Sequence, residues 1–249
     1  MTTGAAPARR SWLQQIMGMP VSVHVRGPGA RTDPCLADVV DAVFAQLREA
    51  DRLFSTYRDD SEVSRLRRGD LTPARCHPLV REVLELCEEA RERTDGWFDA
   101  WLPGGLDPSG LVKGWAVERA AALLADVDGL DHYVNAGGDM AVRVAGPAAP
   151  PWRIGVEDPR DRSRLLAVRE VRCGGIATSG SAARGAHIVD PRTGNRPDDL
   201  LSVTVIGPTL LWADVYATAA VARGRDATDW LAARAPDHEV LVVHRPQDG

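Results

Sequence analysis

The stretch Leu106-Asp-Pro-Ser-Gly-Leu-Val-Lys-Gly-Trp115 leads into a helical segment and then into Asn135-Ala-Gly-Gly-Asp139, and the rest of the chain is organised around it. It contains Lys113, the only lysine among 30 Lys and Arg residues. Lysine carries a compact, strongly hydrated ammonium, whereas arginine carries a planar fork. Because all the other Lys and Arg positions are arginine, the retention of Lys113 indicates a site that a planar guanidinium does not fit. The alternative explanation is that this lysine was kept by chance on an exposed helix surface.

Hydrophobic periodicity predicts both helices and strands along the chain. Residues 136–139 predict a tight hairpin, because glycine accepts the positive φ that such a turn needs. The elements interleave without regular βαβ units, so we expect an α+β fold with mixed or antiparallel sheets flanked by helices. Helices are predicted at 33–54, 78–94, 113–127, 210–223 and 226–234, and strands at 20–25, 132–134, 140–144, 152–157, 165–172, 186–189, 201–206 and 239–243.

Length and composition limit the class of protein. With 249 residues the chain can bury a substantial core, as one domain or as two closely packed subdomains. The net charge of −5 argues against a nucleic-acid partner, which needs a broad basic face. Residues 1–11 lack an apolar core, so we expect a disordered tail before a single domain at 12–243. No signal peptide, lipobox or membrane anchor is visible, which predicts a cytoplasmic protein.

The four cysteines and the glycine-rich stretches match none of the common site motifs. Without a Cys-x-x-Cys pair, the cysteines are interpreted as reduced, buried thiols. The segment from Gly105 to Gly110 has the opening spacing of a P-loop, but Leu111 stands where the motif has lysine. A serine hydrolase is disfavoured because no Gly-x-Ser-x-Gly elbow is present. A phosphate ligand would therefore need another kind of site.

A pair of oxygen ligands is predicted on the helix at 210–223. Asp214 and Thr218 are four residues apart, so both side chains can point at the same place. Carboxylate and hydroxyl oxygens, with a backbone carbonyl and water, suit Mg²⁺. Such a pair is also common on a solvent-exposed helix face, but this helix is otherwise almost wholly apolar, and a buried aspartate needs a partner.

Taken together, these residues resemble the ApbE family of FAD:protein FMN transferases. The matching segments occur in the family's order and together are specific. They are Met17-Gly18, Phe54-Ser-Thr-Tyr57 with Ser61-Glu62, Gly96-Trp-Phe-Asp99, Asp107-Pro-Ser-Gly-Leu-Val-Lys-Gly114, Asn135-Ala-Gly-Gly-Asp139, Trp152-Arg-Ile-Gly-Val-Glu-Asp-Pro159, Ala177-Thr-Ser-Gly180, His187-Ile-Val-Asp-Pro191 with Thr193-Gly194, and Ala213-Asp214 with Ala217-Thr218.

The resemblance implies an ApbE-like catalytic domain that binds FAD and Mg²⁺. It implies transfer of the FMN moiety to a Thr or Ser hydroxyl of an acceptor protein, with AMP leaving. His187 matches the family's essential histidine, and Lys113 is expected to assist as a cation. The metal ligands carried over are Gly110, through its carbonyl, Asp214 and Thr218. The flavin-nucleotide contacts carried over are Met17, Tyr57, Trp97, Phe98, Asp99, Asp107, Lys113 and Ile188.

The sequence also departs from the family pattern and leaves two other functions open. Met19 replaces the usual Thr of a Met-Gly-Thr motif, and the segment from Asp99 to Asp107 is unusually short. The first alternative is a Mg²⁺-dependent FAD pyrophosphatase, in which water replaces the acceptor hydroxyl. The second is a flavin-binding protein without catalytic activity.

Overall fold

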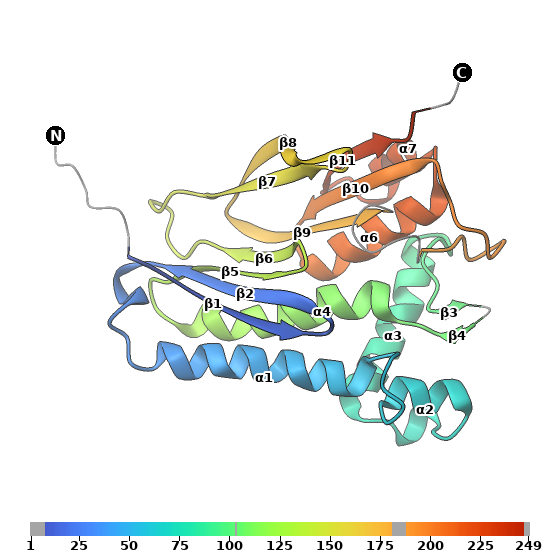
Figure 1. Cartoon of the computed structure of the whole chain (residues 1–249), viewed down its shortest axis with the longest axis horizontal. Helices are drawn as coiled ribbons and strands as arrows, with labels where there is room; N and C mark the ends of the chain where they lie inside the picture. Colours follow the sequence, from blue (N-terminus) through green and yellow to red (C-terminus); the bar gives the residue numbers. More distant parts are fainter. Residues whose placement is uncertain (1–7, 103, 181–187, 247–249) are drawn as a thin grey trace.

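The computed structural model of the chain describes residues 8–102, 104–180 and 188–246. Its centre is a seven-stranded sheet in the order β1-β2-β5-β6-β9-β10-β11, in which every two neighbouring strands are antiparallel (Figure 1). The strands are β1 (Arg9–Ile16), β2 (Met19–Arg26), β5 (Asp131–Ala136), β6 (Asp139–Arg143), β9 (Cys173–Gly180), β10 (Leu200–Gly207) and β11 (Glu239–His244).

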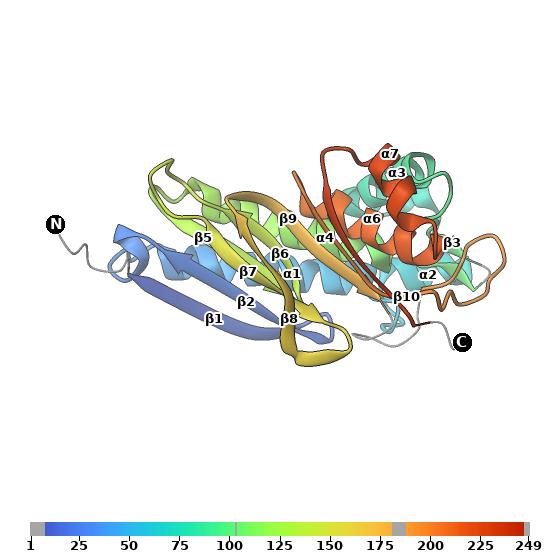
Figure 2. The same cartoon turned by 90° about the horizontal axis from the view of Figure 1, so that it is seen from above.

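Long helices cover one face of this sheet (Figures 1 and 2). They are α1 (Leu36–Phe54), α4 (Ser109–Ala122) and α6 (Leu210–Arg223). Strand β2 alternates between buried residues such as Val21 and Val23 and less buried ones such as Ser22, which is the pattern of a strand with one face on a core. Because α4 and α6 pack against each other as well as on the sheet, residues far apart in sequence meet there.

The remaining elements surround this layer. A short region at one end contains α2 (Glu62–Arg68), α3 (Pro78–Arg93), β3 (Trp101–Leu102) and β4 (Gly105–Leu106), and α7 (Ala227–Arg234) follows α6. Single turns of 3-10 helix lie at Pro28–Ala30, Pro73–Arg75 and Leu123–Asp126. One hydrophobic cluster includes residues of the helical end and of the main layer, such as Val80 and Val117, so the two regions share a core. Within the described residues, no helix has the length and hydropathy needed to cross a bilayer.

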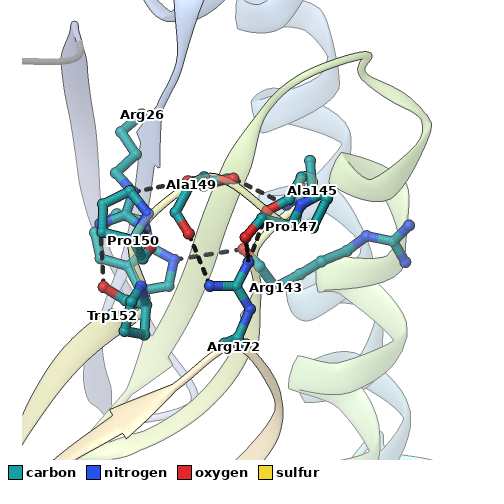
Figure 3. Close-up of polar contacts among 11 residues, drawn as sticks. Arg26, Arg143, Ala145, Pro147, Ala149, Pro150, Trp152 and Arg172 are labelled. Atoms are coloured by element: carbon teal, nitrogen blue, oxygen red, sulfur yellow. Dashed lines mark hydrogen bonds and ion pairs between the residues drawn. The ribbon is translucent and has the colours of Figure 1, made fainter.

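The hairpin formed by β7 (Trp152–Asp158) and β8 (Asp161–Val171) packs on the other face of the sheet. Its base is held by Arg26, which donates to Asp131 Oδ2 at 2.8 Å, donates to the Pro150 carbonyl, and stacks 3.9 Å from the ring centre of Trp152. Arg172 donates to carbonyls of the preceding loop, including that of Ala149 at 2.7 Å (Figure 3). These contacts fix the base of the hairpin, while the turn joining β7 to β8 lies at its far end.

The expected α+β class is confirmed, and the helices predicted at 78–94, 210–223 and 226–234 are found to within one residue. The hairpin predicted at 136–139 is also found, and Gly137 and Gly138 have φ of 62° and 107° there. Other expectations were wrong. Strand β1 begins at Arg9, so residues 9–11 are not part of a tail. Helix α2 and strand β9 were not predicted, and residues 188–189 are not in a strand. Cys35 and Cys173 are exposed, not buried.

Candidate functional site

A cavity of about 260 Å³ lies where α4 and α6 meet the end of β9 and the loops before β3 and before β10. The predicted site residues come from segments more than a hundred positions apart, yet most of them line this one cavity. Those that line it are Tyr57, Trp97, Phe98, Asp99, Asp107, Gly110, Lys113, Ile188, Asp214 and Thr218.

The lone lysine lies between two buried carboxylates. The Nζ atom of Lys113 is 2.9 Å from Oδ1 of Asp214 and also forms an ion pair with Oδ2 of Asp139. The side chains of Asp139 and Asp214 are only 2% and 1% exposed. Asp139 was not among the predicted site residues, although the Asn135-Ala-Gly-Gly-Asp139 motif contained it. The ion pairs follow from tertiary packing, which a linear motif does not reveal.

Burial and charge shift the ionisation of this cluster. Burial opposes the charge of Lys113, but the carboxylates of Asp139 and Asp214 outweigh it and raise the pKa of the ammonium. The pKa of Asp214 is raised to about 6: burial is the main cause, Lys113 acts against it, and the charge of Asp139 adds to the rise. Lys113 is therefore a permanent cation, whereas ionising the buried Asp214 carboxyl costs free energy.

A glycine allows the two helices to form this cluster. A Cβ atom at Gly114 would lie 2.8 Å from the Leu210 carbonyl oxygen and 2.9 Å from Asp214 Cβ. Without that atom α4 approaches α6 closely, and the Gly114 N–H donates to Asp214 Oδ2 at 2.9 Å. The neighbouring Lys113 takes the other carboxylate oxygen. Asp214 is thus oriented at both oxygens by consecutive residues of α4.

Further oxygen atoms lie near this cluster, one turn along α6 and on strand β9. Ser179 Oγ and Thr218 Oγ1 are 3.3 Å apart, and a Cβ atom at Gly110 would be 3.4 Å from Thr218 Oγ1. Oδ2 of Asp139 is buried, and among the described residues its partner is the Lys113 ammonium, with which it forms an ion pair. These hard oxygen donors fit Mg²⁺. Within the described ranges no three carboxylate, histidine or cysteine side chains form a metal cluster, so backbone, hydroxyl and water oxygens would complete the coordination.

Aromatic side chains form another part of the cavity lining. Tyr57 is 98% exposed, and Phe98 is buried. The guanidinium carbon of Arg192 lies 3.8 Å from the ring centre of Trp97, and that of Arg223 lies 5.2 Å from it. Arg192 also donates to the Asp95 carbonyl at 3.1 Å, which fixes the loop after Ile188 to the loop that carries Trp97. The exposed ring of Tyr57 is available for stacking on a planar ligand.

Met17 is the one predicted site residue that the structure describes and that does not line the cavity. It lies in the turn between β1 and β2 with φ of 55°. The expected flavin contact through Met17 stays a prediction. His187 lies outside the residues that the structure describes.

Comparison with known proteins agrees with the geometry. Over 287 residues the chain is 32% identical to the FAD:protein FMN transferase of Vibrio cholerae, covering 91% of this chain and 84% of the relative. Over 288 residues it is 26% identical to the enzyme of the same name from Salmonella typhimurium, covering 90% and 81%.

Solved structures share the fold. The flavin transferase ApbE from Vibrio cholerae superposes with a TM-score of 0.82 at 22% identity, covering 98% of this chain and 96% of that one. The ApbE protein from Thermotoga maritima superposes with a TM-score of 0.80 at 22% identity, covering 95% and 94%. The ApbE family model matches residues 17–104 and 102–242. The chain therefore belongs to the ApbE family.

Proposed function

We propose that this chain is an FAD:protein FMN transferase, which moves the FMN moiety of FAD to a Thr or Ser hydroxyl of an acceptor protein and releases AMP with the help of Mg²⁺. The observation that carries the proposal is the buried Lys113 between Asp139 and Asp214, in a cavity that also presents Tyr57 and Phe98. A cation beside aromatic rings suits a ligand that is both planar and anionic. Relatives over most of the chain bear this enzyme's name.

The charges of the cavity support a need for a metal ion. Its described lining includes the carboxylates of Asp99, Asp107 and Asp214, against the single ammonium of Lys113. Arg91 partly offsets Asp99, at 3.3 Å. A diphosphate entering this lining meets these carboxylates, so a further cation would favour its binding.

The residues that would hold Mg²⁺ are Asp214, Thr218 and the carbonyl of Gly110. When bound, the ion would neutralise diphosphate oxygens, which is the usual contribution of Mg²⁺ to phosphoryl transfer. Gly114 keeps Asp214 in place for this role, because its N–H holds Oδ2 at 2.9 Å. Lys113 adds a second positive charge that persists at any physiological pH, since its pKa is raised.

The proposed step balances without a redox partner. The acceptor oxygen attacks the FMN phosphorus, a P–O bond to the bridging oxygen breaks, and AMP leaves with that oxygen. The hydroxyl proton passes to a base, the role expected for His187, which follows the family resemblance. An imidazole with a pKa near 6.5 is suited to that role. Lys113 stabilises the negative charge that develops on the transferred group.

The test is a transfer assay with FAD, MgCl₂ and candidate acceptor flavoproteins. We expect one FMN added to the acceptor, measured by mass spectrometry, for each AMP released. Thr218→Val should lose most of the metal-dependent rate, whereas the matched Thr218→Ser, which keeps the hydroxyl, should retain it. Rapid AMP release without acceptor would favour the pyrophosphatase, and FAD binding without cleavage would favour the non-catalytic flavin-binding protein.

A further inference from the structure

The two carboxylates beside Lys113 are held in the same way. Asp139 begins β6, and its Oδ1 atom accepts a hydrogen bond of 2.9 Å from the Thr178 N–H of β9. Asp214 lies on α6, and its Oδ2 atom accepts a hydrogen bond of 2.9 Å from the Gly114 N–H of α4. In each carboxylate the other oxygen pairs with the Lys113 ammonium. A backbone N–H therefore orients each carboxylate independently of the lysine.

The two carboxylates differ in their access to the cavity. Lys113 and Asp214 line the cavity, whereas Asp139 does not. A ligand in the cavity can therefore reach the ammonium and Asp214, while Asp139 contacts the lysine from behind the cavity wall. The ammonium thus has one partner that it shares with the cavity and one partner that the cavity does not reach.

The oxygen that the proposed metal ion needs is the one that the ammonium occupies. Oδ1 of Asp214 lies 2.9 Å from Lys113 Nζ, and Oδ2 is held by the Gly114 N–H. Mg²⁺ binds oxygen ligands at about 2.0–2.1 Å in a nearly ideal octahedron. Two cations on one oxygen repel each other, and the repulsion is stronger in a buried site than in water. Lys113 and the ion therefore compete for Asp214.

A lysine can leave one of its two partners and keep the other. Its ammonium carries three N–H donors on a flexible stem, whereas the donors of an arginine are fixed in a planar fork. If Lys113 leaves Asp214, its ion pair with Asp139 still neutralises the buried charge. The donor that Asp214 held then becomes available to an oxygen atom of a ligand in the cavity. This is a physical reason for a lysine at this position.

We propose that Lys113 is an exchangeable cation, which occupies Asp214 in the metal-free protein and pairs with Asp139 alone once Mg²⁺ binds, so that Asp139 is a positioning residue for the lysine. This inference rests on the proposed function, which places Mg²⁺ at Asp214 and Thr218. The exchange leaves neither carboxylate without a cation, because the ion replaces the ammonium at Asp214 and the ammonium stays with Asp139. The metal-free site is stabilised by the same residues that later bind the metal and the diphosphate.

The single lysine makes the exchange measurable in the unmodified protein. Protein labelled with ¹⁵N-lysine has one lysine side-chain NMR signal, because Lys113 is the only lysine. Titration with MgCl₂, without FAD, should move this Nζ signal in parallel with Mg²⁺ binding measured by calorimetry, and NaCl of the same ionic strength should not. Thr218→Val should need about tenfold more Mg²⁺, whereas Thr218→Ser should follow the wild type. A signal that stays in place throughout the wild-type titration would overturn the inference.

A second measurement tests the role of Asp139. Asp139→Asn keeps an oxygen for the Thr178 N–H but removes the charge that retains the lysine, so the dissociation constant for Mg²⁺ should rise about tenfold. The matched background is Lys113→Met, in which no ammonium competes with the ion. In that background the same change should weaken Mg²⁺ binding several-fold less. Unchanged Mg²⁺ affinity in Asp139→Asn would overturn the inference, as would an equal or larger loss in the Lys113→Met background, because Asp139 would then act on the ion by its charge alone.

Failure of the inference differs from failure of the proposed function. Melting temperatures show whether each variant folds, and the wild-type titration decides the exchange even where a variant does not. If MgCl₂ moves the Lys113 signal but no acceptor receives FMN in the transfer assay, the proposed function is wrong and the exchange stands. If FMN transfer occurs but the signal does not move, the exchange is wrong and the function stands.

Discussion

Replacing Lys113 by Met should destabilise the fold strongly. Methionine fills similar volume, but it leaves the carboxylates of Asp139 and Asp214, whose side chains are 2% and 1% exposed, without their cation. Breaking a buried ion pair by removing one partner costs about 3–5 kcal/mol, because the remaining charge stays buried and unpaired. We expect a loss of unfolding free energy of that size at pH 8, measured by urea denaturation followed by tryptophan fluorescence.

The pH dependence of this loss tests its cause. The pKa of Asp214 is already about 6, above its usual value of 3.8, and removal of the ammonium raises it further. A carboxyl whose pKa is higher in the folded state stabilises the fold at low pH and loses that contribution as the pH rises through the folded pKa. The deficit of Lys113→Met should therefore be largest at pH 8 and smaller at pH 5.

A compensating variant completes this prediction. Adding Asp139→Asn to Lys113→Met removes one of the two buried charges, so part of the lost stability at pH 8 should return. A loss below about 1 kcal/mol at pH 8, as for an exposed ion pair, would refute the reasoning. So would a deficit that is the same at pH 5 and pH 8, since the carboxylate charge would then not be its cause.

Other predictions concern function, pH and thiol chemistry. Lys113→Arg should impair FAD cleavage more than folding, because the guanidinium keeps the charge but not the compact shape; paired AMP-release and urea assays decide this. Burial lowers the pKa of His132 to about 4, so the unfolded chain binds the imidazole proton more readily than the native protein does. Between pH 6.5 and pH 4 the unfolding free energy of the wild type should therefore fall by about 3 kcal/mol more than that of His132→Asn. The same fall in both proteins would contradict this. Burial raises the pKa of Cys87 to about 12, so in the native protein a thiol reagent should label Cys35 and leave Cys87 unmodified until denaturant is added.

Local sequence signals accounted for the parts of the fold that have regular periodicity. Helix α6 was predicted at its observed bounds, and the glycines at 137 and 138 marked the β5–β6 turn. Strand β9 was missed because its glycines look like a loop. In the structure a Cβ atom at Gly174 would lie 2.2 Å from the Gly207 carbonyl oxygen, and one at Gly175 would lie 2.2 Å from Leu210 Cα. Close tertiary approach, which leaves no periodic signal, is the reason for glycine there.

Strand β1 and the candidate site also contain features that local sequence signals do not reveal. Strand β1 has a mostly exposed burial pattern, so its sequence lacks the clear alternation of a half-buried strand. At the site, the unique Lys113 and the Asp214–Thr218 spacing were visible in the sequence. The contact of Lys113 with Asp139 and Asp214 was not, because it depends on how closely α4 approaches α6 at Gly114. Motifs thus predicted the candidate residues, and packing determined their partners.

The central claim is that the Lys113 cavity cleaves FAD and passes FMN to a protein hydroxyl. The most direct measurement is a single-turnover reaction of enzyme, FAD, MgCl₂ and acceptor in which AMP and FMN-modified acceptor are both quantified. We expect the two products to form in equal amounts and at the same rate, and we expect both to require Asp214. Release of AMP with free FMN and unmodified acceptor, or full turnover by Asp214→Asn, would contradict it.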